Sequence, residues 1–207
     1  MSDVAGLGDH VSRETTQKLA AYQSSLLRWT KTINLISPST ADAAWERHIV
    51  DSAQVFDLIP KHCRQLVDIG SGGGLPGLVI AIMAQEHKQD LTVTLIESDQ
   101  RKVAFLRTIA RELSLSARII CNRIEAVENI SADVLTARAL APLPDLLGYA
   151  QSILAPRGIA LFQKGRNVAQ EVESARMSWQ FALTSHPSRT DKEGCILQIE
   201  DIRRAET

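Results

Sequence analysis

The chain has 207 residues, of which 44% are hydrophobic and 23% are charged, and its formal net charge is -1. This balance is typical of one globular domain with room for a small attached subdomain, and it excludes a disordered chain and a second full domain. The longest apolar run, residues 75–84, is broken by proline and glycine and is shorter than the roughly 20 residues of a spanning helix. We therefore expect no membrane segment.

The N-terminus and the cysteines indicate the compartment. The first residues lack the basic segment followed by an apolar stretch that marks a secretory signal. The three cysteines, Cys63, Cys121 and Cys195, form no CxxC pair and have no nearby histidine, which argues against a disulfide framework and a zinc site. The sequence therefore predicts a cytoplasmic protein that holds no metal and whose cysteines are reduced and buried.

Residues 13–59 predict two amphipathic helices. Apolar residues recur at steps of three and four from Leu19 to Ile33 and again from Trp45 to Ile59, with a break at Pro38 between them. The aromatic residues in these repeats are expected to pack rather than to stack on a ligand. We interpret residues 1–62 as a helical N-terminal extension that packs on the rest of the chain.

Residues 63–207 predict a second unit in which short apolar strands alternate with helices, the pattern of a parallel sheet built from βαβ units. The tail differs, because two apolar runs are joined there by a polar loop with no helix between them. A terminal hairpin of this kind separates methyltransferase folds from most nucleotide-binding relatives. The expected strands are 65–70, 92–97, 117–122, 133–138 and 158–163, the helices are 76–86, 100–113, 143–154 and 167–177, and the hairpin strands are 181–186 and 195–201.

The most informative stretch is LVDIGSGGGLPG at positions 66–77, where an apolar strand runs into a loop with five glycines. Glycine lets a ligand approach the main chain closely, so we expect Gly70 and Gly72 to border a cofactor at the carboxyl edge of the sheet. Pro76 stands where the first turn of the next helix begins. The GxGxxG spacing of dinucleotide-binding loops is also present, so the loop alone leaves the cofactor open.

Residues at three successive strand ends favour S-adenosylmethionine. The carboxylate of Asp68 is placed to meet the cationic amino acid end of that cofactor. Glu97 closes the second strand, where its carboxylate can accept both hydrogen bonds of a ribose diol. Ile124 and Glu125 follow the third strand, where they can border an adenine.

The chain resembles a known family at several segments. LVDIGSGGGLPG, LIESDQRKVAFL, NRIEA, ARAL and FQKG, preceded by WTKTINL and RHIVDS, look like the bacterial methyltransferases also called glucose-inhibited division protein B, over about residues 29–165. The resemblance implies an α/β fold with a Rossmann-like class I methyltransferase sheet, mostly parallel with a C-terminal antiparallel hairpin. It also implies transfer of a methyl group to guanine N7 in a conserved loop of small-subunit ribosomal RNA. The implied cofactor contacts are Gly70, Leu75, Ile124, Glu125 and Arg138.

The sequence departs from that family's pattern at two positions. Ser71 stands where a threonine is usual, and Ala137 precedes Arg138 where a serine is common. These changes leave the expected fold unaltered, although details of substrate recognition can differ.

The expected chemistry needs alignment rather than a dedicated base, because guanine N7 carries a lone pair and no proton. Arg138 occupies the strand end where other methyltransferases carry (N/D)PP(Y/F) or a Pro-Cys pair. Its guanidinium can contact the cofactor, stack against a base or act as a base, and a surface ion pair is the alternative. We therefore assign no catalytic residue beyond this candidate.

A basic helix follows Glu97. At helical spacing Arg101, Arg107 and Arg111 lie opposite its apolar face, which predicts a surface for RNA phosphates, although a solvated charged face has the same pattern. Further candidates for RNA contact are Lys164, Arg166, Arg47 and His48, of which the histidine can equally be a packing residue.

The expected partner is small-subunit ribosomal RNA or the small ribosomal subunit, bound by a monomer. Three alternatives stay open at this point. A small-molecule methyltransferase would share every cofactor feature without needing the basic helix. An NAD-dependent oxidoreductase would use the GxGxxG spacing but lacks an evident acid and base for hydride transfer. The third alternative is a cofactor-binding protein without activity.

Overall fold

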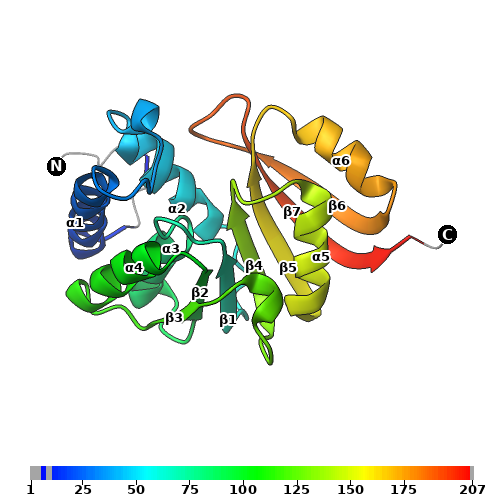
Figure 1. Cartoon of the computed structure of the whole chain (residues 1–207), viewed down its shortest axis with the longest axis horizontal. Helices are drawn as coiled ribbons and strands as arrows, with labels where there is room; N and C mark the ends of the chain where they lie inside the picture. The colour runs from blue at the N-terminus through cyan, green and yellow to red at the C-terminus, as the bar shows by residue number, and fades with distance from the viewer. Residues whose placement is uncertain (1–5, 8–10, 206–207) are drawn as a thin grey trace.

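A computed structural model describes residues 6–7 and 11–205. Its centre is a seven-stranded sheet with the strand order β3-β2-β1-β4-β5-β7-β6 (Figure 1). The first five strands of the chain pair in parallel, and β7 lies antiparallel between β5 and β6. The strands are β1 Gln65–Ile69, β2 Thr92–Glu97, β3 Ala117–Cys121, β4 Ala132–Arg138, β5 Leu154–Lys164, β6 Trp179–Pro187 and β7 Cys195–Arg204.

Helices cover both faces of the sheet and bury two separate apolar clusters. One cluster holds residues of α1 to α4, and the other holds residues of α5 and α6, which lie together on the opposite side of the sheet (Figure 1). The α-helices are α1 Arg13–Thr30, α2 Asp51–Phe56, α3 Gly77–His87, α4 Gln100–Glu112, α5 Leu143–Ile153 and α6 Val168–Arg176. Shorter helical segments are Pro38–Thr40, Trp45–Val50 and Ile124–Ala126.

The sheet confirms the predicted arrangement of strands, since all seven runs form strands and the last two form the antiparallel hairpin. Strand β1 is buried along its last four residues because helices cover it on both faces, which explains its continuous apolar run. The start of β5 differs from the prediction: it begins at Leu154 rather than at residue 158. The chain passes directly from α5 into the sheet, where Leu154 pairs with Ala132 before an irregularity in register.

The N-terminal helices differ in length from the prediction. Helix α1 ends at Thr30, so Ile33 is buried in the connection beyond it. The second predicted helix is divided into a π-helical segment, Trp45–Val50, and the short α2. Both parts share one hydrophobic cluster with α3 and α4.

The prediction of three buried cysteines is wrong for one of them. Cys63 and Cys195 are buried, whereas Cys121 is exposed. The reason is its position at the end of β3, the outermost parallel strand, whose side chains are only partly covered. In the described part of the chain, no helix is both long and apolar enough to cross a membrane.

Candidate functional site

The glycine loop leaves β1 at the carboxyl edge of the sheet and leads into α3. Gly70, Gly72 and Gly74 have φ angles of 62°, 54° and 89°, in the left-handed region that glycine adopts without strain. A Cβ on Gly70 would collide with the side chain of Leu140, whereas a Cβ on Gly72 would have no neighbour closer than 3.8 Å. The loop therefore requires glycine for its shape and leaves open space beside Gly72.

Asp68 lies beneath this loop with its carboxylate fully buried. Its Oδ1 accepts a hydrogen bond of 2.7 Å from the hydroxyl of Thr136, and its Oδ2 has no hydrogen-bond partner among the described residues and lies beside Gly77. Burial raises the pKa of Asp68 to about 6. The two cavities at the loop are lined by other residues, and contact of the Asp68 carboxylate with a cofactor stays a prediction.

Glu97 stands at the end of β2, as the sequence predicted, and binds the loop to the neighbouring turn. Its Oε2 accepts from the backbone N–H of Gly72 at 2.9 Å, and its Oε1 accepts from the N–H of Asp99 at 2.8 Å. A cavity of about 280 Å³ opens beside it, and its lining includes Gly70, Ile124 and Glu125. Four of the predicted cofactor residues are therefore brought together at one cavity.

Tyr149, which no sequence pattern singled out, also lines this cavity. Its hydroxyl donates a hydrogen bond of 2.6 Å to Glu125, and that bond holds the pKa of the Glu125 carboxyl below its usual value. Tyr149 lies on α5, far from the glycine loop in sequence, so no local pattern points to it.

A second cavity of about 380 Å³ continues along the strand ends on the other side of Gly70. It is lined by Gly72 and Leu75 of the loop and by Arg138 at the end of β4. Gly70, Lys102 and Ala139 border both cavities, which makes them two parts of one cleft. Together, the two parts bring the predicted cofactor residues other than Asp68 to a single edge of the sheet.

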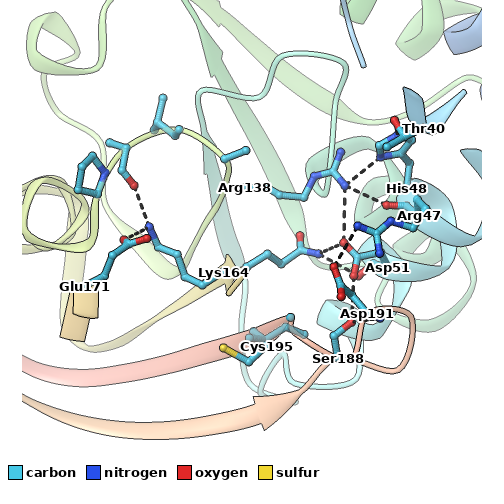
Figure 2. Close-up of a pocket in the computed structure, with 18 residues that line it drawn as sticks. Thr40, Arg47, His48, Asp51, Arg138, Lys164, Glu171, Ser188, Asp191 and Cys195 are labelled. Carbon is cyan, nitrogen blue, oxygen red and sulfur yellow. Dashed lines mark hydrogen bonds and ion pairs between the residues drawn. The ribbon is translucent and has the colours of Figure 1, made fainter. Parts of the chain in front are cut away.

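Arg138 lines both this cleft and a third cavity of about 520 Å³. Figure 2 shows the side chains of the third cavity. Its Nη1 donates to the carbonyl of Arg47 at 3.3 Å and to Nδ1 of His48 at 3.1 Å, and it lies 3.6 Å from the carboxylate of Asp51. The side chain of Arg138 is 18% exposed. A nearly buried cation is thus held by three groups of the N-terminal segment, and it is not the surface ion pair considered as an alternative.

His48 is a neutral partner of that arginine. Burial, followed by the charges of Arg138 and Arg47, lowers the pKa of His48 to about 4. With Nδ1 accepting from Arg138, the Nε2–H donates to the hydroxyl of Thr40 at 2.8 Å. That hydroxyl in turn donates to the carbonyl of Ser37. The chain of hydrogen bonds fixes the ring, so His48 positions Arg138 and does not extend a basic surface.

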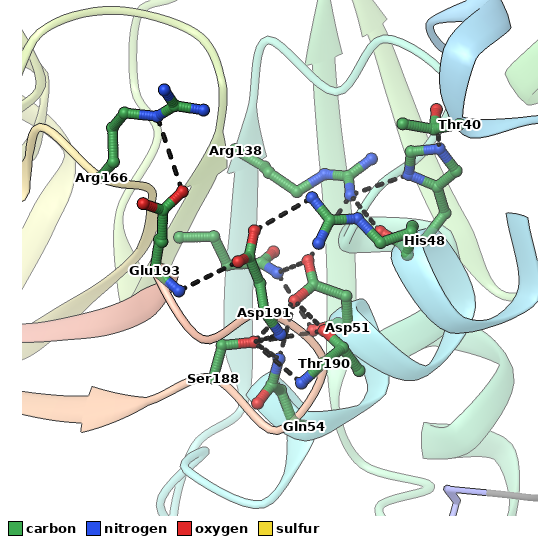
Figure 3. A network of polar contacts seen from close by, with 12 residues as sticks. Thr40, His48, Asp51, Gln54, Arg138, Arg166, Ser188, Thr190, Asp191 and Glu193 are labelled. Atoms are coloured by element: carbon green, nitrogen blue, oxygen red, sulfur yellow. Dashed lines mark hydrogen bonds and ion pairs between the residues drawn. The ribbon is translucent and has the colours of Figure 1, made fainter. Parts of the chain in front are cut away.

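Asp51 is the centre of the network that surrounds the third cavity (Figure 3). Its carboxylate accepts from Nε2 of Gln163 at 2.6 Å and from the hydroxyl of Thr190 at 2.9 Å, and Gln54 donates to it at 2.8 Å. Asp51 therefore joins α2, the end of β5 and the loop between β6 and β7. It belongs to the RHIVDS segment, but no local pattern reveals its role, because Gln163 and Thr190 lie more than 100 residues away in the sequence.

Three of the basic candidates lie on helix α4. Arg101, Arg107 and Arg111 are exposed on α4, and the opposite face with Val103 and Leu106 is buried, as the helical spacing predicted. Arg101 forms an ion pair with Asp99, the residue that caps α4.

The two basic candidates beyond β5 differ from each other. The side chain of Lys164 is only 9% exposed, and its amine donates to the carbonyl of Ala141 and to Glu171. This lysine is therefore engaged inside the protein rather than presented on the expected RNA surface. Arg166 is exposed and lies 3.7 Å from Glu193.

The sheet with its C-terminal hairpin, the glycine loop and the strand-end acids define a Rossmann-like methyltransferase. Solved structures have this fold. A TehB-like methyltransferase from Corynebacterium glutamicum superimposes with a TM-score of 0.58 at 15% identity, covering 87% of this chain and 98% of that one. An O-methyltransferase from Bacillus cereus, solved with S-adenosylhomocysteine, has a TM-score of 0.58 at 12% identity, covering 87% and 91% of the two chains.

The family model described as rRNA small subunit methyltransferase G matches residues 15–194. A protein of that name from Jannaschia is 48% identical, covering 93% of this chain and 92% of the relative. The chain belongs to this family, and it is a methyltransferase whose cofactor is S-adenosylmethionine.

Proposed function

We propose that this protein transfers the methyl group of S-adenosylmethionine to N7 of a guanine in small-subunit ribosomal RNA. The observation that carries the proposal is the position of Arg138, a fixed cation that lines both the cleft at the glycine loop and the third cavity beside it. The names of the relatives support ribosomal RNA as the substrate. We further propose that the protein acts as a monomer in the cytoplasm.

The residues at the cleft suit the parts of S-adenosylmethionine, which supplies a methyl group on a sulfonium when bound. Glu97 would accept hydrogen bonds from the ribose hydroxyls, and Ile124 and Glu125 would border the adenine. Gly70 and Gly72 would allow the rest of the cofactor, beyond its ribose and adenine, to lie against the main chain, with Leu75 beside it. The methyl group would then face Arg138 and the third cavity.

The chemistry that this chain must supply is alignment. Guanine N7 attacks with its own lone pair, so no proton has to be removed before the methyl group moves. The neutral ring of His48 and the carboxylate of Asp51 hold the guanidinium of Arg138 in place, which keeps the boundary between the two cavities rigid. We therefore assign these side chains to positioning and assign no general base.

Family membership removes the oxidoreductase alternative. A methyltransferase for small molecules would use the same cleft, but it would have no use for three exposed arginines on α4. The basic face of that helix therefore favours a polyanionic substrate.

The proposal is tested by incubating the purified protein with labelled S-adenosylmethionine and small ribosomal subunits that lack the modification. We expect one labelled guanine, with the methyl group at N7 shown by cleavage of the RNA backbone at the modified base. A Gly72→Val variant provides the control, because its side chain would occupy the space beside the loop and block cofactor binding. Label on another atom or another base, or no label with wild-type protein that binds S-adenosylmethionine, would contradict the proposal.

A further inference from the structure

Gln163 lines the third cavity, and the oxygen of its side-chain amide has no hydrogen-bond partner among the described residues. Its Nε2 donates two hydrogen bonds to Asp51, one to the backbone carbonyl at 3.0 Å and one to the carboxylate at 2.6 Å. These two bonds fix the orientation of the amide, since only the nitrogen can donate them. The remaining atom, Oε1, is buried and has no hydrogen-bond partner in the described part of the chain. A buried acceptor without a partner is costly, so a donor from a ligand would satisfy it.

Arg138 provides free donors next to this acceptor. Among the described residues, every hydrogen bond and ion pair of its guanidinium runs through Nη1, which leaves Nε and Nη2 available. Arg138 and Gln163 are directly paired in register on β4 and β5. Paired residues on neighbouring parallel strands point to the same face and lie roughly 4.8 Å apart. Both residues also line the third cavity, so a residue with free donors and a residue with an unpaired acceptor are neighbours in its wall.

We infer that Arg138 and Gln163 select guanine as the target base, with Arg138 donating to O6 and Gln163 Oε1 accepting from N1–H. This inference rests on the proposed function. The order of groups along the edge of guanine is N7, then O6, then N1–H. Arg138 borders the cofactor cleft as well as the third cavity, whereas Gln163 borders only the latter. A guanine with N7 toward the cofactor therefore presents O6 to Arg138 and N1–H to Gln163.

The same pair rejects adenine. Adenine carries a donor, N6–H₂, where guanine has O6, and an unprotonated acceptor where guanine has N1–H. Arg138 would then face a donor with a donor, and Gln163 would face an acceptor with an acceptor. Both purines have a free N7, so the discrimination has to come from these neighbouring positions. Buried polar groups that are left unpaired discriminate strongly between substrates.

The test combines variants of the protein with analogues of the target base. Small subunits or RNA fragments are prepared with guanine, inosine or 2-aminopurine at the target position. Inosine keeps O6 and N1–H, whereas 2-aminopurine lacks both. The wild type is compared with Gln163→Leu and Gln163→Met, and Gln180→Leu, an exposed position on β6, is the matched control. The value of kcat/KM is measured for each combination of protein and target base, and the cofactor affinity is measured for each protein.

We expect the wild type and Gln180→Leu to prefer guanine and inosine to 2-aminopurine. Gln163→Leu and Gln163→Met should lower kcat/KM for guanine and inosine by roughly 5- to 100-fold, the range of one base-edge contact, and leave 2-aminopurine nearly unchanged. Cofactor affinity should stay at the wild-type value. The base preference is a ratio of kcat/KM values measured on one preparation of each variant. A fraction of unfolded protein therefore does not alter it.

An equal loss on all three bases would overturn the inference, since Gln163 would then not distinguish one base from another. An unchanged preference would overturn it as well. Failure of the proposed function is distinguishable, because in that case the wild type itself would place no methyl group on guanine N7.

Discussion

Asp68 shows how one buried side chain makes the stability of this protein depend on pH. Its folded-state pKa is raised from 3.8 to about 6 by burial, so the charged form is disfavoured in the folded protein. The stability that Asp68 contributes is therefore fully present below about pH 4 and is lost as the pH rises through about 6.

An Asp68→Asn variant should lose this dependence, because its amide carries no charge at any pH while its oxygen can still accept from Thr136. Relative to the wild type, its free energy of unfolding should rise by up to about 3 kcal/mol between pH 4 and pH 8. Urea unfolding of both proteins across this range measures the difference. Asp90→Asn, at an exposed position, is the control and should show no comparable trend. If the difference in free energy of unfolding between Asp68→Asn and the wild type does not change with pH, the carboxylate of Asp68 is charged in the folded protein at little cost.

Helix α4 has an exposed basic face that is a candidate surface for RNA. Arg107 and Arg111 are exposed and form no ion pair in the described structure, whereas Arg101 is bound to the capping residue Asp99. Reversing Arg101 would therefore remove this ion pair and place a second carboxylate beside Asp99, an effect unrelated to RNA. The cleaner test of the RNA surface changes Arg107 and Arg111 alone.

Changing Arg107 and Arg111 to Glu should weaken binding to small subunits and flatten its salt dependence. Each lost phosphate contact removes a slope of roughly 0.7 to 0.9 in log affinity against log salt, so the loss should be about 1.5 units or more. The measurement is RNA affinity over a salt series, with cofactor affinity as the internal reference. The matched control replaces Arg157 and Arg203, which line a cavity elsewhere in the fold. Equal weakening in both variants would mean that only net charge matters.

At the level of elements, the sequence predicts strands better than the connections between them. The strands from Gln65 to Arg138 were located to within one residue, because apolar runs and glycine-rich turns are local signals. The π-helical segment Trp45–Val50 and the early start of β5 were missed, since both depend on packing against distant elements. The same limit applies to the site. Glu97 and Arg138 were found at strand ends, whereas Asp51 and Gln163 acquire their roles only from partners across the fold.

At the scale of the whole molecule, residues from the N-terminal part of the chain complete the candidate site. That segment supplies His48 and Asp51 to the guanidinium of Arg138 at the end of β4. It also covers the glycine loop from outside, where Leu26 of α1 lies against Gly73. Residues between Leu26 and Asp51 therefore contact both the loop and the arginine.

Tyr22 on α1 makes this dependence testable. Its hydroxyl is buried and donates a hydrogen bond of 2.6 Å to the carbonyl of Gly73, and burial raises its pKa so far that it stays protonated at any ordinary pH. A Tyr22→Phe variant keeps the ring, which packs near Phe105, and removes only the donor. The buried carbonyl of Gly73 would then be unsatisfied, which costs about 1–3 kcal/mol in the free energy of unfolding.

We expect the cost to appear in cofactor binding as well as in stability, because the carbonyl belongs to the loop that borders the cleft. Urea unfolding gives the first quantity and calorimetric titration with S-adenosylmethionine gives the second. Thr15→Val provides a comparison, since it removes a buried hydroxyl from the same helix whose partner is Glu86, at the far end of α3 from the glycine loop. That variant should lose stability and keep its cofactor affinity. If Tyr22→Phe behaves in the same way, α1 stabilises the fold without shaping the cofactor cleft, because the loop then holds its conformation through Glu97 and its own glycines alone.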